Sequence, residues 1–110
     1  MMDSKPDIRL NIMMLLLKSG EDISVREIAR RLDRPSGHVF YHLKKLYEMG
    51  ILNREELDDR VYYTPQAIFT EDVDGVLEDL SKLSELIEDA DEDKIANCVT
   101  MFLKCYNSVF

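Results

Sequence analysis

Two pairs of side chains in this sequence have spacings that metal-binding or redox chemistry could use. His38 and His42 are four residues apart and Cys98 and Cys105 are seven apart, so each pair shares one face of a helix. No cysteine or carboxylate near the histidines completes a ligand set, and two ligands do not make the usual four-coordinate zinc site. Seven residues of helix separate the cysteine Cα atoms by about 10 Å, which is beyond the reach of a disulfide bond.

We therefore expect no metal site and no cofactor. The cysteines belong to a broad apolar stripe and are expected to be buried, although an intersubunit disulfide or a soft-metal site shared with a second chain stays open. The sequence also contains no Gly-rich phosphate loop, no nucleophile elbow and no His-Glu-x-x-His pattern. These absences predict a protein that is not an enzyme.

Basic side chains are concentrated in one segment of an acidic protein. The 110 residues have a formal net charge of −8, all of which comes from residues 69–110. Residues 24–47 have a local excess of basic groups. These are Arg26, Arg30, Arg31, Arg34, Lys44 and Lys45, against Glu27 and Asp33. This asymmetry predicts a binding surface for a nucleic acid, joined to an acidic part with another role.

The elements that position this basic segment are predicted from periodicity and capping signals. A helix is expected from about Ser4 to Lys18, and its apolar residues surround it so fully that we expect burial by a partner subunit as well as by the core. Ser24-Val25-Arg26-Glu27 is a capping box, which begins a short helix over 25–32.

A third helix over about 36–49 follows the Asp33-Arg34-Pro35 break, with Ser36 as its expected cap. Its inward face is predicted from helical spacing. That face consists of Val39, Leu43 and Leu46. Two strands, 51–57 and 60–64, are predicted to form a hairpin around Asp58-Asp59. Two helices joined by a short turn and followed by a hairpin indicate a winged helix-turn-helix, which makes the fold mainly α with a small β-hairpin.

The run Ser36-Gly37-His38-Val39-Phe40-Tyr41-His42-Leu43-Lys44-Lys45-Leu46, followed by Gly50-Ile51-Leu52, closely resembles the recognition-helix region of ArsR-like transcriptional regulators. The resemblance extends from about Asp7 through Tyr63. It implies a DNA-binding scaffold, and it implies a structural role for His42. The cysteine-containing metal motif of metal-sensing relatives is absent.

An inserted helix needs donors and flat groups on the face opposite its core-facing side. The DNA-binding residues expected from this geometry, the preceding turn and the wing are Arg34, Ser36, Gly37, His38, Phe40, Tyr41, Lys44, Lys45, Arg54 and Arg60. Tyr41 and Lys44 are the best candidates for base edges, and Gly37 would permit close approach of a phosphate. Phe40 packs on a thymine methyl or serves another surface.

The wing departs from the family pattern. Relatives usually have a glycine at its tip, whereas this chain has Asp58-Asp59 with two glutamates nearby. Carboxylates repel phosphates, so we expect the wing to contribute little affinity. The resemblance implies that Arg60 reaches the minor groove.

The remaining chain is expected to form acidic helices that make a homodimer. Apolar residues spaced 3, 4, 3, 4, 3 from Val73 to Ala90 have the pattern of a coiled-coil seam, and a last helix, capped by Asp91, has a broad apolar face. The residues predicted for dimerisation are Leu10, Met14, Leu17, Val76, Leu80, Leu83, Ile87, Val99, Phe102 and Tyr106. Residues 1–68 are thus the predicted DNA-binding domain, and residues 69–110 the dimerisation segment packed with the first helix.

The sequence as a whole predicts a prokaryotic, sequence-specific DNA-binding regulator, a repressor that binds double-stranded DNA as a homodimer. No export signal or stretch of about 20 apolar residues is present, so a cytoplasmic protein without membrane contact is expected. An unidentified small-molecule effector, bound between the last two helices and the first, is compatible with this function. The alternative is a protein–protein adaptor that uses the acidic helices and does not bind specific DNA.

Overall fold

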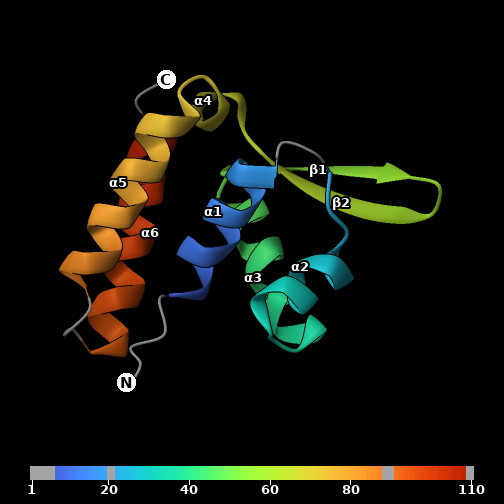
Figure 1. Cartoon of the computed structure of the whole chain (residues 1–110), viewed down its shortest axis with the longest axis horizontal. Helices are drawn as coiled ribbons and strands as arrows, with labels where there is room; N and C mark the ends of the chain where they lie inside the picture. The colour runs from blue at the N-terminus through green and yellow to red at the C-terminus, as the bar shows by residue number, and fades with distance from the viewer. Residues whose placement is uncertain (1–6, 20–21, 88–90, 109–110) are drawn as a thin grey trace.

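The computed structural model describes residues 7–19, 22–87 and 91–108. Along the chain the elements are α1 (Ile8–Ser19), α2 (Val25–Leu32), α3 (Ser36–Glu48), β1 (Leu52–Leu57), β2 (Arg60–Pro65), α4 (Ala67–Thr70), α5 (Val73–Leu86) and α6 (Glu92–Ser108). Figure 1 shows α1 between the α2–α3 pair and the C-terminal helices, with the hairpin projecting to one side. The predicted fold class, mainly helical with a two-stranded antiparallel hairpin, is confirmed.

Helix α1 is the centre of the core. Leu10, Ile12 and Met13 are completely buried, because α2 and α3 contact the helix on one side and α5 contacts it on another. α6 contributes Val99 to the same hydrophobic cluster. The expectation that a partner subunit is needed to bury this helix is therefore wrong: the chain's own C-terminal helices supply that cover.

Helix α2 begins as its sequence predicts, but only half of the capping box forms. The Ser24 hydroxyl accepts a hydrogen bond from the backbone N–H of Glu27 at 3.2 Å. The Glu27 carboxylate instead accepts hydrogen bonds from Arg30 and Arg31. The helix ends at Asp33, whose left-handed backbone (φ 55°) lets the chain turn into α3.

The N-cap of α3 is one residue earlier than the sequence predicts. Ser36 is its first residue rather than its cap; Pro35 occupies the cap position, and no side chain caps this end of α3. The inward face is confirmed, since Val39, Leu43 and Leu46 are all completely buried. One face of α3 is thus fixed in the core while the other faces solvent.

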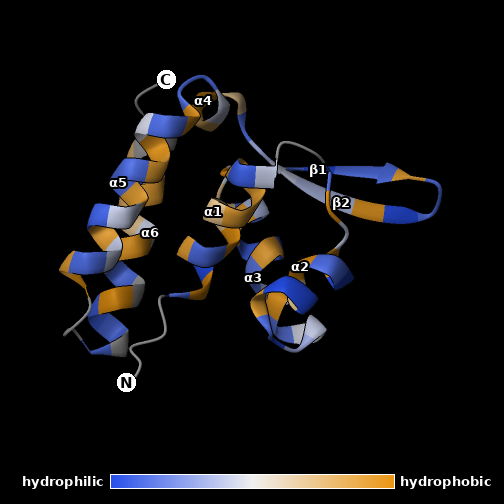
Figure 2. Ribbon diagram, viewed as in Figure 1, coloured by the Kyte–Doolittle hydropathy of each residue, from blue (hydrophilic) through white to orange (hydrophobic). Residues whose placement is uncertain are grey.

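The hairpin pairs Leu57 with Arg60 across a two-residue turn. Asp58 and Asp59 both have positive φ, 50° and 65°, which is the backbone of a type I′ turn and matches the right-handed twist of the strands. In Figure 2 β1 is hydrophilic over most of its length. Tyr63 of β2, in contrast, is 2% exposed and belongs to the hydrophobic core.

The C-terminal part contains one element that periodicity does not predict, the single turn α4, which buries Phe69. Helix α5 ends at Leu86, so the predicted seam runs along it from Val73 to Leu83. Ile87 is the C-cap, and Ala90 lies outside the described residues. Asp91 caps α6 as predicted, since its carboxylate accepts a hydrogen bond from the Lys94 N–H at 2.9 Å. Within the described part of the chain, no helix is long and apolar enough to cross a membrane.

Candidate nucleic-acid interface

The outward face of α3 is exposed as its sequence predicts. The residues concerned are Ser36, Gly37, His38, Phe40, Tyr41, Lys44 and Lys45. Tyr41, at 55% exposure, is the most open aromatic side chain of the described residues. The Lys45 ammonium lies 5.7 Å from the centre of its ring, a cation–π distance. The middle of α3 therefore presents a flat ring and two lysines together.

Phe40 is held differently from its neighbours on this face. Its ring stands edge-on to the ring of Tyr63, with the centroids 6.5 Å apart. Tyr47, seven residues further along α3, approaches Tyr63 in the same way at 6.3 Å. Of the two roles predicted for Phe40, this contact favours the second, because the ring holds α3 against the hairpin.

A basic hollow of about 600 Å³ lies where α2 turns into α3. Arg26, Arg34 and Ser36 contribute to its lining, and the uncapped N-terminus of α3 opens beside it. A Cβ placed on Gly37 would meet nothing within 4 Å, so its own packing does not require a glycine there. Backbone N–H groups at a helix N-terminus beside guanidinium groups favour an anion such as phosphate.

Arg26 lines this hollow although it is not among the DNA-binding residues expected from the sequence. Its spacing was informative, since Arg26 and Arg30 are four residues apart and so share one face of α2. Arg30, however, is engaged together with Arg31 by Glu27. These two hydrogen-bonded guanidinium groups lower the pKa of Glu27 to about 2. Part of the predicted basic excess is therefore neutralised within α2.

The wing offers less positive charge than its two arginines suggest. Arg54 donates a hydrogen bond to Glu56 at 2.9 Å, and its pKa is raised by its hydrogen bonds to Glu56 and Tyr63. Arg60 is exposed and forms no ion pair within the part of the chain that the structure describes. The wing's carboxylates, from Glu55 to Asp59, are exposed as well.

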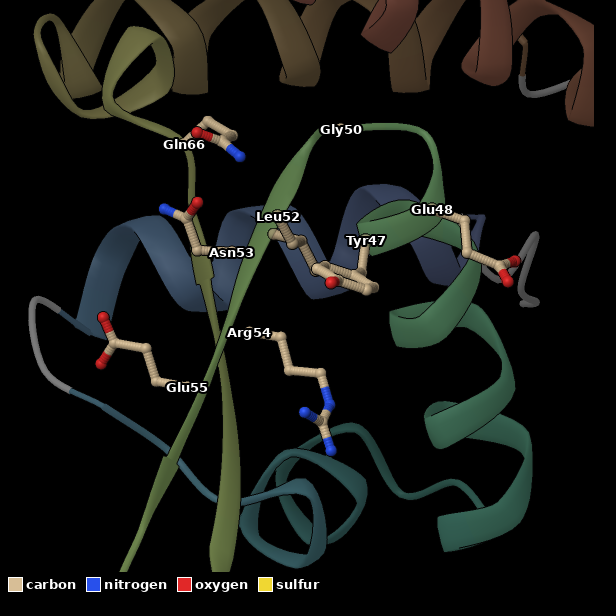
Figure 3. Close-up of a pocket in the computed structure, with 8 residues that line it drawn as sticks. All are labelled: Tyr47, Glu48, Gly50, Leu52, Asn53, Arg54, Glu55 and Gln66. Carbon is tan, nitrogen blue, oxygen red and sulfur yellow. The ribbon is translucent and has the colours of Figure 1, made fainter.

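A second hollow, of about 590 Å³, lies between the end of α3 and β1. Figure 3 shows Tyr47 and Glu48 from α3 beside Leu52, Arg54 and other β1 side chains. Charges of both signs line it, and it is distant in the chain from the effector position predicted between the first and the last two helices. No separate chemical role follows from this mixed surface.

The two histidines lie closer together than helical spacing alone implies. The Nε2 atoms of His38 and His42 are 3.2 Å apart. The pKa of His42 is lowered, first by burial and then by the charges of His38, Arg9 and Arg34, with Asp7 acting in the opposite direction. Among the described residues, no three His, Cys, Asp or Glu side chains gather as metal ligands.

Most of the residues predicted for dimerisation are buried within one chain. They are Leu10, Leu17, Val76, Leu80, Ile87 and Val99. Met14, Leu83 and Phe102 are half-buried, and the side chain of Tyr106 lies outside the described residues. These six side chains were predicted to contact a second chain, but the fold of one chain already buries them. Helical periodicity identifies an apolar face, and here α1, α5 and α6 cover one another's apolar faces.

The cysteine expectation also needs correction. Cys98 and Cys105 are both exposed, because Val99 and Leu103 are the α6 residues turned into the core. Met101, 66% exposed, lies between the two cysteines on the outer side of the helix. An unburied strip of sulfur-containing side chains therefore follows α6.

Comparison with known proteins finds a family match in the first half of the chain. Residues 6–54 match the family model of the bacterial regulatory proteins of the arsR family. This ArsR-type region comprises α1, α2, α3 and the start of β1, so it includes both the basic hollow and the exposed face of α3. No curated protein matches the chain in sequence.

Solved structures extend the similarity of fold beyond the ArsR-type region. MepR, a transcription regulator of the Staphylococcus aureus multidrug efflux pump MepA, has a TM-score of 0.57 at 14% identity, over 93% of this chain and 78% of its own. The structure of hsRosR-S1 gives 0.55 at 23% identity, over 96% of both chains. A MarR family protein from Bacillus stearothermophilus gives 0.53 at 13%, over 91% and 72%. The matched family consists of bacterial regulatory proteins, and MepR is a transcription regulator.

Proposed function

We propose that this protein is a sequence-specific DNA-binding transcription regulator, a repressor that acts as a homodimer with α3 in the major groove. The observation that carries this proposal is the exposed face of α3, which continues into an arginine-lined hollow at the helix N-terminus. A groove-reading helix needs base-reading side chains along its outer face and phosphate-binding groups at its end. Both are present on one surface.

Each residue of this surface has a proposed role. Tyr41 and Lys44 are exposed at the centre of the helix and contact base edges, assisted by Ser36 and His38. Arg34, the backbone at Gly37, and Lys45 contact phosphates. Lys45 is only weakly engaged within the chain, since its ammonium is 3.8 Å from Glu48 and exposed. Arg60 reaches the minor groove, and the paired Arg54 contributes least.

The homodimer is proposed to form through the apolar surface that the fold leaves uncovered. Leu86 of α5 is 82% exposed and Met101 of α6 is 66% exposed, while Met14, Leu83 and Phe102 are only half-buried. Residues 69–110 would thus pair two chains and keep their negative charge away from DNA. Two-fold symmetry would present two α3 helices to half-sites about 34–36 Å apart.

The test is fluorescence anisotropy of the full chain with a selected duplex site and with random duplex, over a series of salt concentrations. Tyr41→Ala is expected to reduce discrimination between the two duplexes by about 1–3 kcal/mol. Lys45→Ala is expected to weaken both complexes and to make the salt dependence less steep. Absence of salt-sensitive duplex binding would reject the proposal and favour the adaptor that uses the acidic helices.

A further inference from the structure

We propose that His38 and His42 form a two-imidazole binding site for a divalent transition-metal ion on the exposed side of α3. This proposal departs from the expectation, drawn from the sequence, that no metal site is present. That expectation concerned a tightly held, four-ligand zinc centre, whereas the proposed site takes two ligands from the protein and the others from its surroundings. Metal binding by this pair does not depend on the proposed DNA-binding function.

The distance between the two nitrogens fits a shared metal ion. Two metal–nitrogen bonds of about 2.0–2.1 Å span about 2.9 Å at a right angle and about 3.4 Å at the tetrahedral angle. The observed separation of the two Nε2 atoms, 3.2 Å, lies between these limits. Residues four apart on a helix are neighbours, and here the rings also meet edge-on, with centroids 4.9 Å apart. The two ligands are therefore already convergent.

The protonation of the pair also suits a metal. A hydrogen bond between two Nε2 atoms requires one ring to carry its proton on Nε2 and the other to offer a lone pair there. A metal between them needs both protons on Nδ1, so one proton moves from Nε2 to Nδ1 and none is lost. Both rings must be neutral to bind the metal, since a protonated imidazole has no free lone pair.

The surrounding charges come from three elements. Arg9 and Asp7, at the start of α1, form an ion pair with each other, and Arg34 lies in the turn before α3; all three act on His42. On α3 itself the Tyr41 ring is 5.2 Å from the ring of His42. Among residues 7–19, 22–87 and 91–108 no carboxylate joins the histidines as a third ligand. Imidazole nitrogen therefore decides the metal class, which is Cu²⁺, Ni²⁺ or Zn²⁺ rather than Mg²⁺ or Ca²⁺.

The experiment titrates Zn²⁺ alone into the full chain carrying Cys98→Ser and Cys105→Ser, so that thiols do not compete. The chain contains only two histidines, so each imidazole has an assignable proton NMR signal. Both signals are expected to shift together and to saturate at one Zn²⁺ per chain. Calorimetry should show affinity at least about tenfold weaker in His38→Ala, with Cu²⁺ bound more tightly than Zn²⁺.

The matched control is the pair of changes Ser36→His and His38→Ala. It keeps two imidazoles on α3 but separates them by six residues, which places them on different faces; Ser36 is exposed and forms no cap, so the fold should tolerate the change. This control should bind as weakly as His38→Ala. Equal affinity in the control, or signals that do not shift at one equivalent, would overturn the proposal, whatever the outcome of the DNA-binding test.

Discussion

The ring of Phe40, on the exposed side of α3, stands edge-on to the buried ring of Tyr63 on β2, at 67° and with 6.5 Å between centroids. This contact joins the proposed DNA-reading helix to the wing. Phe40 is 46% exposed although it is a large apolar residue, whereas Tyr63 is 2% exposed. The partly open ring of Phe40 therefore has a packing partner within the chain.

Phe40→Ala should lower the free energy of unfolding by about 1 kcal/mol, because it removes an edge-to-face pair and some apolar contact. Phe40→Leu should lose less, since it keeps most of the apolar contact. Urea denaturation measures both changes. If Phe40 instead read a thymine methyl, Phe40→Ala would leave stability unchanged and weaken binding only to sites that contain that thymine.

Gly37→Ala should separate folding from DNA binding. The added Cβ meets no atom within 4 Å, and alanine is the better helix former, so stability should rise by up to about 1 kcal/mol. If a phosphate lies against the Gly37 backbone, affinity for all duplex sequences should fall. Thermal denaturation and anisotropy on the same sample check the two effects. A variant that binds DNA as well as the original would contradict the close approach.

Glu27→Gln should change stability in a pH-dependent way. Hydrogen bonds from Arg30 and Arg31 lower the pKa of Glu27 to about 2 from 4.5. Because the folded-state value is the lower one, the pairing stabilises the fold above pH 4.5 and is lost as pH falls toward 2. The original protein should therefore exceed the variant in stability at pH 6 and approach it near pH 2.

The same substitution should strengthen duplex binding at low salt, since it removes a negative charge and frees two guanidinium groups. Glu85→Gln is the matched control: it removes an exposed carboxylate from α5, outside the proposed interface with DNA. Urea denaturation at several pH values and anisotropy at two salt concentrations supply the measurements. Equal gains in affinity for the two variants would mean that only net charge matters.

Met101→Asp should convert the proposed dimer into a folded monomer. The side chain is 66% exposed in the single chain, so an aspartate costs the monomer little, whereas burying its charge between two chains is unfavourable. Asn53→Asp, an exposed change on β1, adds the same charge elsewhere and should leave the dimer intact. Sedimentation analysis at tens of micromolar protein measures the oligomeric state of each variant. If the unchanged protein is itself monomeric at that concentration, the dimer proposal is wrong.

The sequence by itself determined the local elements that short-range physics controls. Val39, Leu43 and Leu46 share one face at any helical geometry, and they are buried together. The hairpin around Asp58-Asp59 and the Asp91 cap likewise depend on residues only two or three positions apart. Ser36 is an instructive exception, because Pro35 before it takes the cap position and Ser36 begins the helix.

Only the tertiary structure decided which surfaces meet. Periodicity identifies the apolar face of α5 but not its partner, so Val76 and Leu80 suit a second chain or this chain's own core equally well until α1 is placed against them. For the same reason the sequence could not show that Glu27 binds two arginines or that Phe40 meets Tyr63. The separation of the histidine nitrogens also depended on side-chain orientation. The spacing of residues along a helix determines which side of the helix each side chain is on. Which residues it contacts there depends on how the other elements of the chain pack against that side.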